Sequence, residues 1–105
     1  MSDIWMVYST FAKKDEAVSI ARQLLEARLV ACANIHDGVT SLYRWEGAIR
    51  EESEAVLVAK THRRQLQPAM EMVKRLHSYA LPCIIAYPIE GGYPPYLKWI
   101  EDETT

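Results

Sequence analysis

The stretch from residue 30 to residue 60, VACANIHDGVTSLYRWEGAIREESEAVLVAK, decides how this chain folds. Its second half alternates, with apolar side chains on one face and mostly charged ones on the other, which is typical of a half-buried strand. Glu46-Gly47, just after Trp45, offers a turn between two long strands. Asp37-Gly38 is a competing signal: it is either a two-residue hairpin turn or a bulge in one long strand. The turn at Trp45-Glu46-Gly47 gives the fewer and more regular elements, although the sequence does not rank the two firmly.

The residues before this stretch predict one strand and one helix. Ile4 to Thr10 is short and rich in β-branched and aromatic residues, and nearly every side chain is apolar, which predicts a central strand. From Lys13 to Arg28 the apolar residues recur at helical spacing. Asp15 and Glu16 fall in the first turn and Arg28 in the last, where each charge complements the helix dipole.

The residues after it predict a second helix, a short strand and a terminal helix. The second helix shows an apolar stripe that ends at His77, and Pro68 limits its start to the region 64–67, because proline is tolerated in the first helical turn. Pro82 precedes a short apolar strand over residues 83–87. Residues 96–101 read as a brief helix, and residues 101–105 as a polar tail.

The resulting order, β-α-β-β-α-β with a short C-terminal helix, is that of the ferredoxin-like fold, an α/β (α+β) architecture with an antiparallel sheet. We expect one domain over residues 1–105. Both helices would cover the same face of the sheet and leave the other face bare. Partner subunits are the economical cover for that face.

Composition narrows the function classes. The chain has 105 residues, of which 25% are charged, and a net charge of -2, which argues weakly against a nucleic-acid binder. The start of the chain has no basic region followed by an apolar run, and no stretch reaches about 18 apolar residues, so neither a signal peptide nor a membrane span is expected. The two cysteines, Cys32 and Cys83, are expected to be reduced thiols in the cytoplasm.

Candidate chemistry is sparse and each candidate has a plain structural reading. Cys32, Cys83 and His77 could contribute to a metal site built from distant segments, and thiol plus imidazole suits copper or zinc. A free cysteine is more often a small buried hydrophobe, and a histidine at this position more often a hydrogen-bonded helix-end residue. The glutamates at 51, 52 and 54 read as a solvated strand, with Glu51 turned inward. No phosphate-binding glycine loop appears, and the aromatic residues favour interface packing.

Five segments, in order along nearly the whole chain, resemble one family. They are residues 30–35 (VACANI), 41–49 (SLYRWEGAI), 54–61 (EAVLVAKT), 77–82 (HSYALP) and 96–100 (YLKWI), and they resemble the A-C-x-N-I, S-x-Y-x-W-x-G-x-I, E-x-x-L-x-x-K-T, H-P-Y-x-x-P and Y-x-x-W-I stretches of the CutA divalent-cation tolerance family. Jointly these motifs are specific, although singly none would be.

The resemblance implies a ferredoxin-like fold, a compact homotrimer, and a cytoplasmic protein without enzymatic activity. It implies that Asp37-Gly38 is a bend and not the main turn. It links the chain to copper or another divalent cation, which the fold itself is not expected to require. It carries over Cys32 and His77 as candidate ligands, and it places four residues in a cleft between subunits: Tyr43, Trp45, Lys60 and Tyr79.

The sequence departs from the family where relatives read H-P-Y-E-x-P-E-I. Ala80 and Cys83 stand where the family carries two carboxylates. If those acids bind metal in relatives, Cys83 could instead supply a softer ligand near His77, which would shift the preference toward copper(I) or zinc. Two alternatives to metal tolerance stay open: a PII-like signalling or small-ligand trimer, and a structural trimer that anchors a partner protein. The long hairpin would be the trimerising arm, with Tyr43 and Trp45 packed on a neighbour.

Overall fold

A computed structural model describes residues 3–105, which form one four-stranded sheet and three helices. In chain order the elements are β1 (Ile4–Phe11), α1 (Lys14–Glu26), β2 (Cys32–Trp45), β3 (Ala48–His62), α2 (Arg63–Leu76), β4 (Ile84–Pro88) and α3 (Pro94–Glu103). The strands are antiparallel in the order β2-β3-β1-β4. The ferredoxin-like order predicted from the sequence is confirmed, and β1 is central as its apolar sequence indicated.

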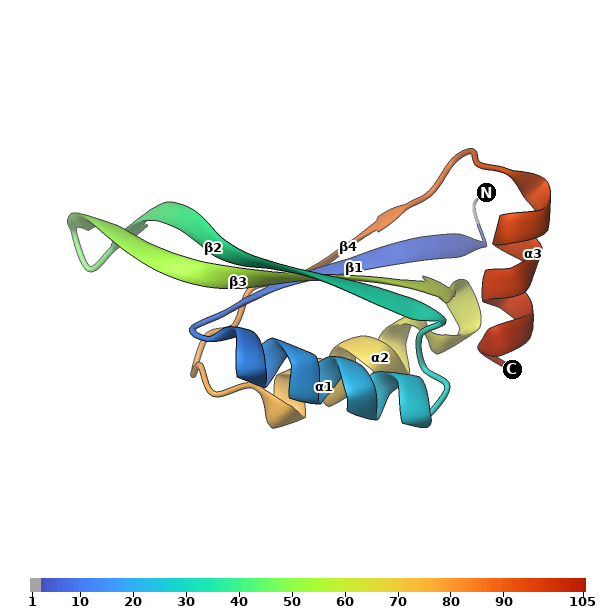
Figure 1. Cartoon of the computed structure of the whole chain (residues 1–105). Coiled ribbons are helices and arrows are strands. Elements are labelled where there is room, and N and C mark those ends of the chain that lie inside the picture. Colours follow the sequence, from blue (N-terminus) through green and yellow to red (C-terminus); the bar gives the residue numbers. More distant parts are fainter. Residues whose placement is uncertain (1–2) are drawn as a thin grey trace.

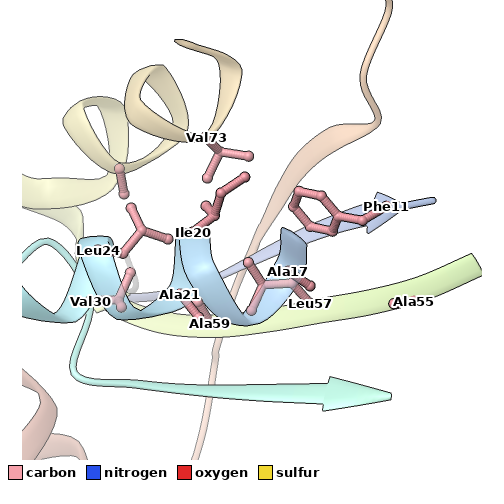
Figure 2. Packing of buried hydrophobic residues seen from close by; sticks show 11 residues of the cluster. Phe11, Ala17, Ile20, Ala21, Leu24, Val30, Ala55, Leu57, Ala59 and Val73 are labelled. Atoms are coloured by element: carbon pink, nitrogen blue, oxygen red, sulfur yellow. The ribbon is translucent and has the colours of Figure 1, made fainter. Parts of the chain in front are cut away.

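The core lies between the sheet and the two helices beneath it (Figures 1 and 2). Alternate residues of β1 and β3 point to this side, and α1 meets them with one stripe of apolar side chains. Buried members of the cluster include Phe11, Ala17, Ile20, Leu24, Val30, Leu57, Ala59 and Val73. α1 and α2 both lie on this face, so the other face of the sheet, called here the open face, carries no helical layer of its own (Figure 1).

The hairpin of β2 and β3 extends past the helices as an arm (Figure 1). Its turn is at Glu46-Gly47, where both residues have positive φ, 49° and 79°. The register shifts between His36 and Val39, so Asp37-Gly38 is a bulge and not the hairpin turn. The longer pairing considered in the sequence is therefore the one that forms.

Both helix predictions need correction at their ends. α1 stops at Glu26 with no basic residue in its last turn, because Arg28 lies beyond it with a φ of 58°. Arg28 instead donates to the backbone oxygens of Asp102 and Thr105 near the C-terminus. α2 begins at Arg63, so Pro68 lies inside the helix and not in its first turn. Pro68 is exposed, so water can satisfy the carbonyl that loses its partner there.

The end of the chain is not a polar tail. α3 runs on to Glu103, and Thr104 is fully buried, with its hydroxyl donating to the carbonyl of Ile100 at 2.9 Å. Gln65 of α2 donates to the carbonyl of Thr104 at 3.0 Å. These bonds fix the last turn of α3 against the start of α2.

No helix within residues 3–105 is both long and apolar enough to cross a membrane.

Candidate functional site

The bulge at Asp37-Gly38 decides which side chains of β2 reach the open face. Between the hairpin turn and the bulge, Trp45 of β2 lies opposite Ala48 of β3. On the other side of the bulge the register has shifted by one residue, and Cys32 of β2 lies opposite Lys60 of β3. Without the extra residue the same register would set Cys32 opposite Thr61, a buried residue on the helix side. Since a one-residue slip moves every side chain to the other face, the bulge brings Cys32 out to the open face.

Four polar side chains meet there, and we call them the thiol–lysine cluster: Cys32, Asn34, Lys60 and Tyr96. The Lys60 ammonium donates to Asn34 Oδ1 at 3.2 Å and to Cys32 Sγ at 3.7 Å. The Tyr96 hydroxyl lies 3.4 Å from the same sulfur. A half-buried cysteine sulfur is a soft donor, the kind of atom that soft metals prefer.

α3 supplies the aromatic side of this cluster. The rings of Tyr96 and Trp99 are stacked, with centroids 5.6 Å apart. The hydrogen bond to Cys32, followed by partial burial, raises the pKa of the Tyr96 phenol, which therefore stays protonated at neutral pH. Tyr96 and Asn34 were not singled out as site residues from the sequence, because their contact with Cys32 depends on where α3 docks and on the register of β2.

A second group lies toward the arm, at the far end of β1, and we call it the histidine–carboxylate cluster: Glu54, His77, Tyr79 and Cys83. His77 Nδ1 accepts the backbone N–H of Tyr79 at 3.1 Å, so Nε2 carries the proton and donates to the carbonyl of Thr10 at 2.8 Å. The His77 side chain is 0% exposed and stacks on Phe11 at 4.4 Å. Both nitrogens are therefore occupied, which matches the hydrogen-bonded helix-end reading of this histidine.

Glu54 is the buried carboxylate of this strand, at 8% exposure, whereas Glu51, expected to turn inward, is exposed. The alternation was read correctly, but Glu51 lies on the arm, which has no core beneath it. The Tyr79 hydroxyl donates to Glu54 Oε2 at 2.8 Å. Burial, then this hydrogen bond and the charge of Glu54, raises the pKa of Tyr79 far above its usual value.

Cys83 belongs to the same cluster. Burial, followed by the charge of Glu54, raises the pKa of its thiol, and a hydrogen bond with Thr10 offsets part of that effect. The backbone carbonyl of Thr10 holds His77, so Cys83 and His77 approach the same residue of β1 from different segments. The expectation that Cys83 supplies a ligand near His77 stays a prediction.

The predicted metal ligands nevertheless divide between the two clusters. Cys32 lies opposite Lys60 of β3, and Lys60 lies opposite Met6 of β1. His77 instead contacts Thr10, which is four residues after Met6 on β1. Four residues of strand span about 13 Å, which is too far for one ion. In the part of the chain that the structure describes, no three His, Cys, Asp or Glu side chains are grouped to hold a metal. Both cysteines are free thiols. The metal-ligand assignment stays a prediction.

The four predicted cleft residues also divide. Lys60 belongs to the thiol–lysine cluster and Tyr79 to the histidine–carboxylate cluster. Tyr43 lies near the latter: partial burial and a hydrogen bond with Glu52 raise the pKa of its phenol, and the charge of Glu54 adds to this effect. Trp45 is near the tip of the arm and is 43% exposed. Within one chain these four residues do not form a cleft, so a cleft would need a neighbouring subunit.

Comparisons with known proteins agree over nearly the whole length. Residues 5–103 match the family model described as CutA1 divalent ion tolerance protein. The chain is 41% identical to the divalent-cation tolerance protein CutA of Thermus thermophilus, with 94% of this chain and 96% of that protein covered. It is 37% identical to the chloroplastic protein CutA of Arabidopsis thaliana, with 94% of this chain but 54% of that protein covered.

Solved structures give the same answer. CutA from Xylella fastidiosa superposes with a TM-score of 0.95 at 36% identity, covering 99% of this chain and 100% of that one. The family match, the sequence identity and the superposition all extend over both clusters and the arm. The resemblance noted in the sequence is therefore confirmed, and this chain belongs to the CutA1 divalent ion tolerance protein family.

Proposed function

We propose that this chain acts as a homotrimer in divalent-cation tolerance and that it binds copper or another divalent cation through thiols on the open face of the sheet. The observation that carries the proposal is the open face itself. It presents a polar thiol cluster at one end, and the chain also leaves large apolar side chains exposed along the arm, on β4 and on α3. They include Trp45, Ile85, Tyr87 and Trp99. Exposed apolar surface of this extent marks an interaction site.

Trimerisation would bury this surface and complete the cation site. One chain offers fewer than three grouped ligands over residues 3–105, so a shared site would draw ligands from more than one subunit. Cys32 leads the proposed set, because its sulfur is beside Lys60 and half-buried on the open face. Cys83 is the second soft donor. His77 would join only by giving up one of its two hydrogen bonds.

The proposed compartment is the cytoplasm, and no catalytic activity is assigned. Two free thiols suit a reducing compartment. The Arabidopsis relative carries the name chloroplastic, but this chain spans about half of that protein. Fractionation of cells that express the chain at native level would test the location, and recovery in a membrane-enclosed or exported fraction would contradict it.

Native mass spectrometry of protein purified without affinity metals tests the main proposal. We expect a mass of three subunits. In separate titrations with copper(I) and with zinc(II), we expect bound metal whose affinity falls at least tenfold in Cys32→Ser. Cys83→Ser reports whether the second cluster contributes. Ser19→Ala on the exposed face of α1 is the matched control. A monomer, or equal affinity of all four proteins for each of the two ions, would contradict the proposal.

A small-ligand trimer of the PII-like kind is the second candidate. The observation that favours it is the ammonium of Lys60 beside the stacked rings of Tyr96 and Trp99, a combination able to hold a small polar aromatic molecule. A small molecule retained through purification and seen in the same spectra would favour this candidate. A trimer with neither metal nor ligand would instead favour an anchoring role.

A further inference from the structure

His62 joins three elements at the end of the sheet remote from the arm. It is the last residue of β3, it lies opposite Ile4 of β1, and it is the N-cap of α2. Its imidazole Nδ1 accepts the backbone N–H of Arg64 at 3.1 Å. Its Nε2 faces the Glu101 carboxylate of α3 at 3.6 Å. The side chain is 12% exposed, so the ring has little freedom to leave this position.

As the N-cap of α2, the neutral His62 imidazole can have only one of its two tautomers. Nδ1 must be bare to cap the helix, so the single proton of the neutral ring is on Nε2, toward Glu101. A second proton would go to Nδ1 and remove the acceptor, which leaves the N–H of Arg64 unpaired. It would also place a positive charge at a helix N-terminus, where the dipole disfavours cations.

The charged groups around the ring oppose proton uptake on one side and favour it on the other. Arg63 and Arg64 of α2 lie directly beyond the cap, and Arg63 is paired with Asp3 at 3.5 Å. On the α3 side Glu101 attracts a charged ring, but Lys98 competes for that carboxylate at 3.8 Å. Glu90 lines the same shallow depression. Lys60 is on the open face and bonded to Asn34. Glu101 is half-exposed and shared with Lys98, so its attraction for a charged His62 ring is weakened. The hydrogen bond from the Arg64 amide, by contrast, is lost completely when Nδ1 takes up a proton.

The cap also holds α3. The guanidinium of Arg64 donates to the backbone carbonyl of Glu101 at 2.8 Å, so the residue whose N–H is capped also binds the residue that faces the ring. We propose that His62 makes the docking of α3 pH-sensitive: proton uptake on Nδ1 uncaps α2 and loosens α3 at Glu101. α3 carries Tyr96, which contacts Cys32, so the same proton weakens one side of the thiol–lysine cluster.

Amide hydrogen exchange measured by NMR on the assembled protein, at about pH 8 and at about pH 5.5, tests this. We expect the protection factor of the Arg64 amide, relative to Val73 in the middle of α2, to fall about fivefold at the lower pH, the effect of one lost N-cap. The Trp99 indole resonance should shift with the same midpoint, because α3 moves with the cap.

Two variants separate this device from general acid effects. His62→Asn keeps a capping oxygen that does not titrate, so it should fold and show no fall at Arg64 and no shift at Trp99. His36→Asn removes an exposed histidine of β2 and should respond like the wild type. The proposal is overturned if the wild-type Arg64 amide keeps its protection, if Trp99 does not follow it, or if His62→Asn retains either response.

Discussion

Ile49 and Leu57 point to the same side of the same strand, eight residues apart, yet Ile49 is 73% exposed and Leu57 is 0% exposed. Both lie at alternate positions that face the same side of β3, as do Glu51 and Ser53 between them. Leu57 belongs to the core cluster that packs against α1 (Figure 2). Ile49 follows two residues after the turn residue Gly47, and this end of the hairpin extends past the helices (Figure 1). Alternation therefore fixes which face a side chain takes, but the elements beneath the strand fix whether it is buried. An arm that exposes Leu42, Tyr43, Trp45 and Ile49 without a core of its own calls for a partner.

The largest effect should come from breaking the arm's proposed contact. We expect Trp45→Arg to reduce the sedimenting mass to one third, because a charge buried against a neighbouring subunit is very costly. The fold of each chain should survive, with an unchanged far-ultraviolet circular dichroism spectrum, since Trp45 lies outside the core. Ser19→Arg, on the exposed face of α1, should leave the mass unchanged. A trimer that persists in Trp45→Arg would refute the assignment of the arm.

The next largest effect concerns stability, and it compares the core half of β3 with the half that lies in the arm. Leu57→Ala should lower the free energy of unfolding by about 2–5 kcal/mol, since it removes a fully buried side chain and leaves a cavity. Ile49→Ala is the matched change on the same face of the arm. In a variant that is already monomeric it should cost under about 0.5 kcal/mol. Urea unfolding of both variants in the Trp45→Arg background, at one protein concentration, would measure this. Similar losses at the two positions would contradict the contrast.

The same contrast explains which features could be predicted from the sequence. The strands, both main helices and the hairpin turn follow from apolar periodicity, which is local. The burial of Glu54 and of Thr104 was missed, because each depends on an element distant in the chain: Tyr79 for Glu54 and α2 for Thr104. Pro68 was placed too early in its helix, because an exposed helix face tolerates a proline that the local rule excludes.

Five members of the two clusters, Cys32, Lys60, His77, Tyr79 and Cys83, were named from the sequence, but the geometry that groups them with Asn34, Glu54 and Tyr96 was not foreseen. Cys32 and Lys60 become neighbours only through a register that includes the bulge, and the sequence left the bulge and the hairpin turn as alternatives. His77 and Cys83 approach Thr10 through loops, whose paths no periodicity encodes. The division of the predicted ligands between two clusters could not be foreseen for the same reason.

A smaller effect concerns the carboxylate where the arm meets the core. Tyr79→Phe leaves the buried Glu54 without its donor and should lower the free energy of unfolding by about 1–3 kcal/mol. Burial and Glu54 raise the pKa of Tyr79, so the folded protein holds this proton more tightly than the unfolded chain. The stabilisation is then present below about pH 10, the unfolded value, and is lost as the pH rises above it.

Urea unfolding at a series of alkaline pH values would check that sign. The wild type should lose stability more steeply above about pH 10 than Tyr79→Phe does. Tyr93→Phe changes a well-exposed tyrosine of the loop before α3, so it should follow the wild type. Parallel curves for the wild type and Tyr79→Phe would show that the Tyr79–Glu54 bond contributes nothing to stability.

The smallest effect on stability should arise at the bulge that separates the arm from the core. Gly38 has a φ of 68°, and a β-carbon added there would meet no atom within 4 Å, so Gly38→Ala introduces backbone strain without a clash. We expect a loss of about 1 kcal/mol, and a smaller one for Gly38→Asn, because asparagine tolerates this conformation better. Equal losses for the two variants would contradict strain as the cause.

The same two variants test whether the bulge determines the position of Cys32 in the thiol–lysine cluster. Since the bulge turns Cys32 toward Lys60, strain that removes it would move Cys32 to the helix side, opposite Thr61. Gly38→Ala should therefore slow the reaction of Cys32 with a thiol reagent, measured in a Cys83→Ser background, more than its effect on stability alone would suggest. Gly38→Asn should react nearly as the parent does. If Cys32 of the Gly38→Ala variant reacts at the parent rate, the pairing of Cys32 with Lys60 does not depend on the glycine, and the pairing of β2 with β3 is sufficient to hold that register.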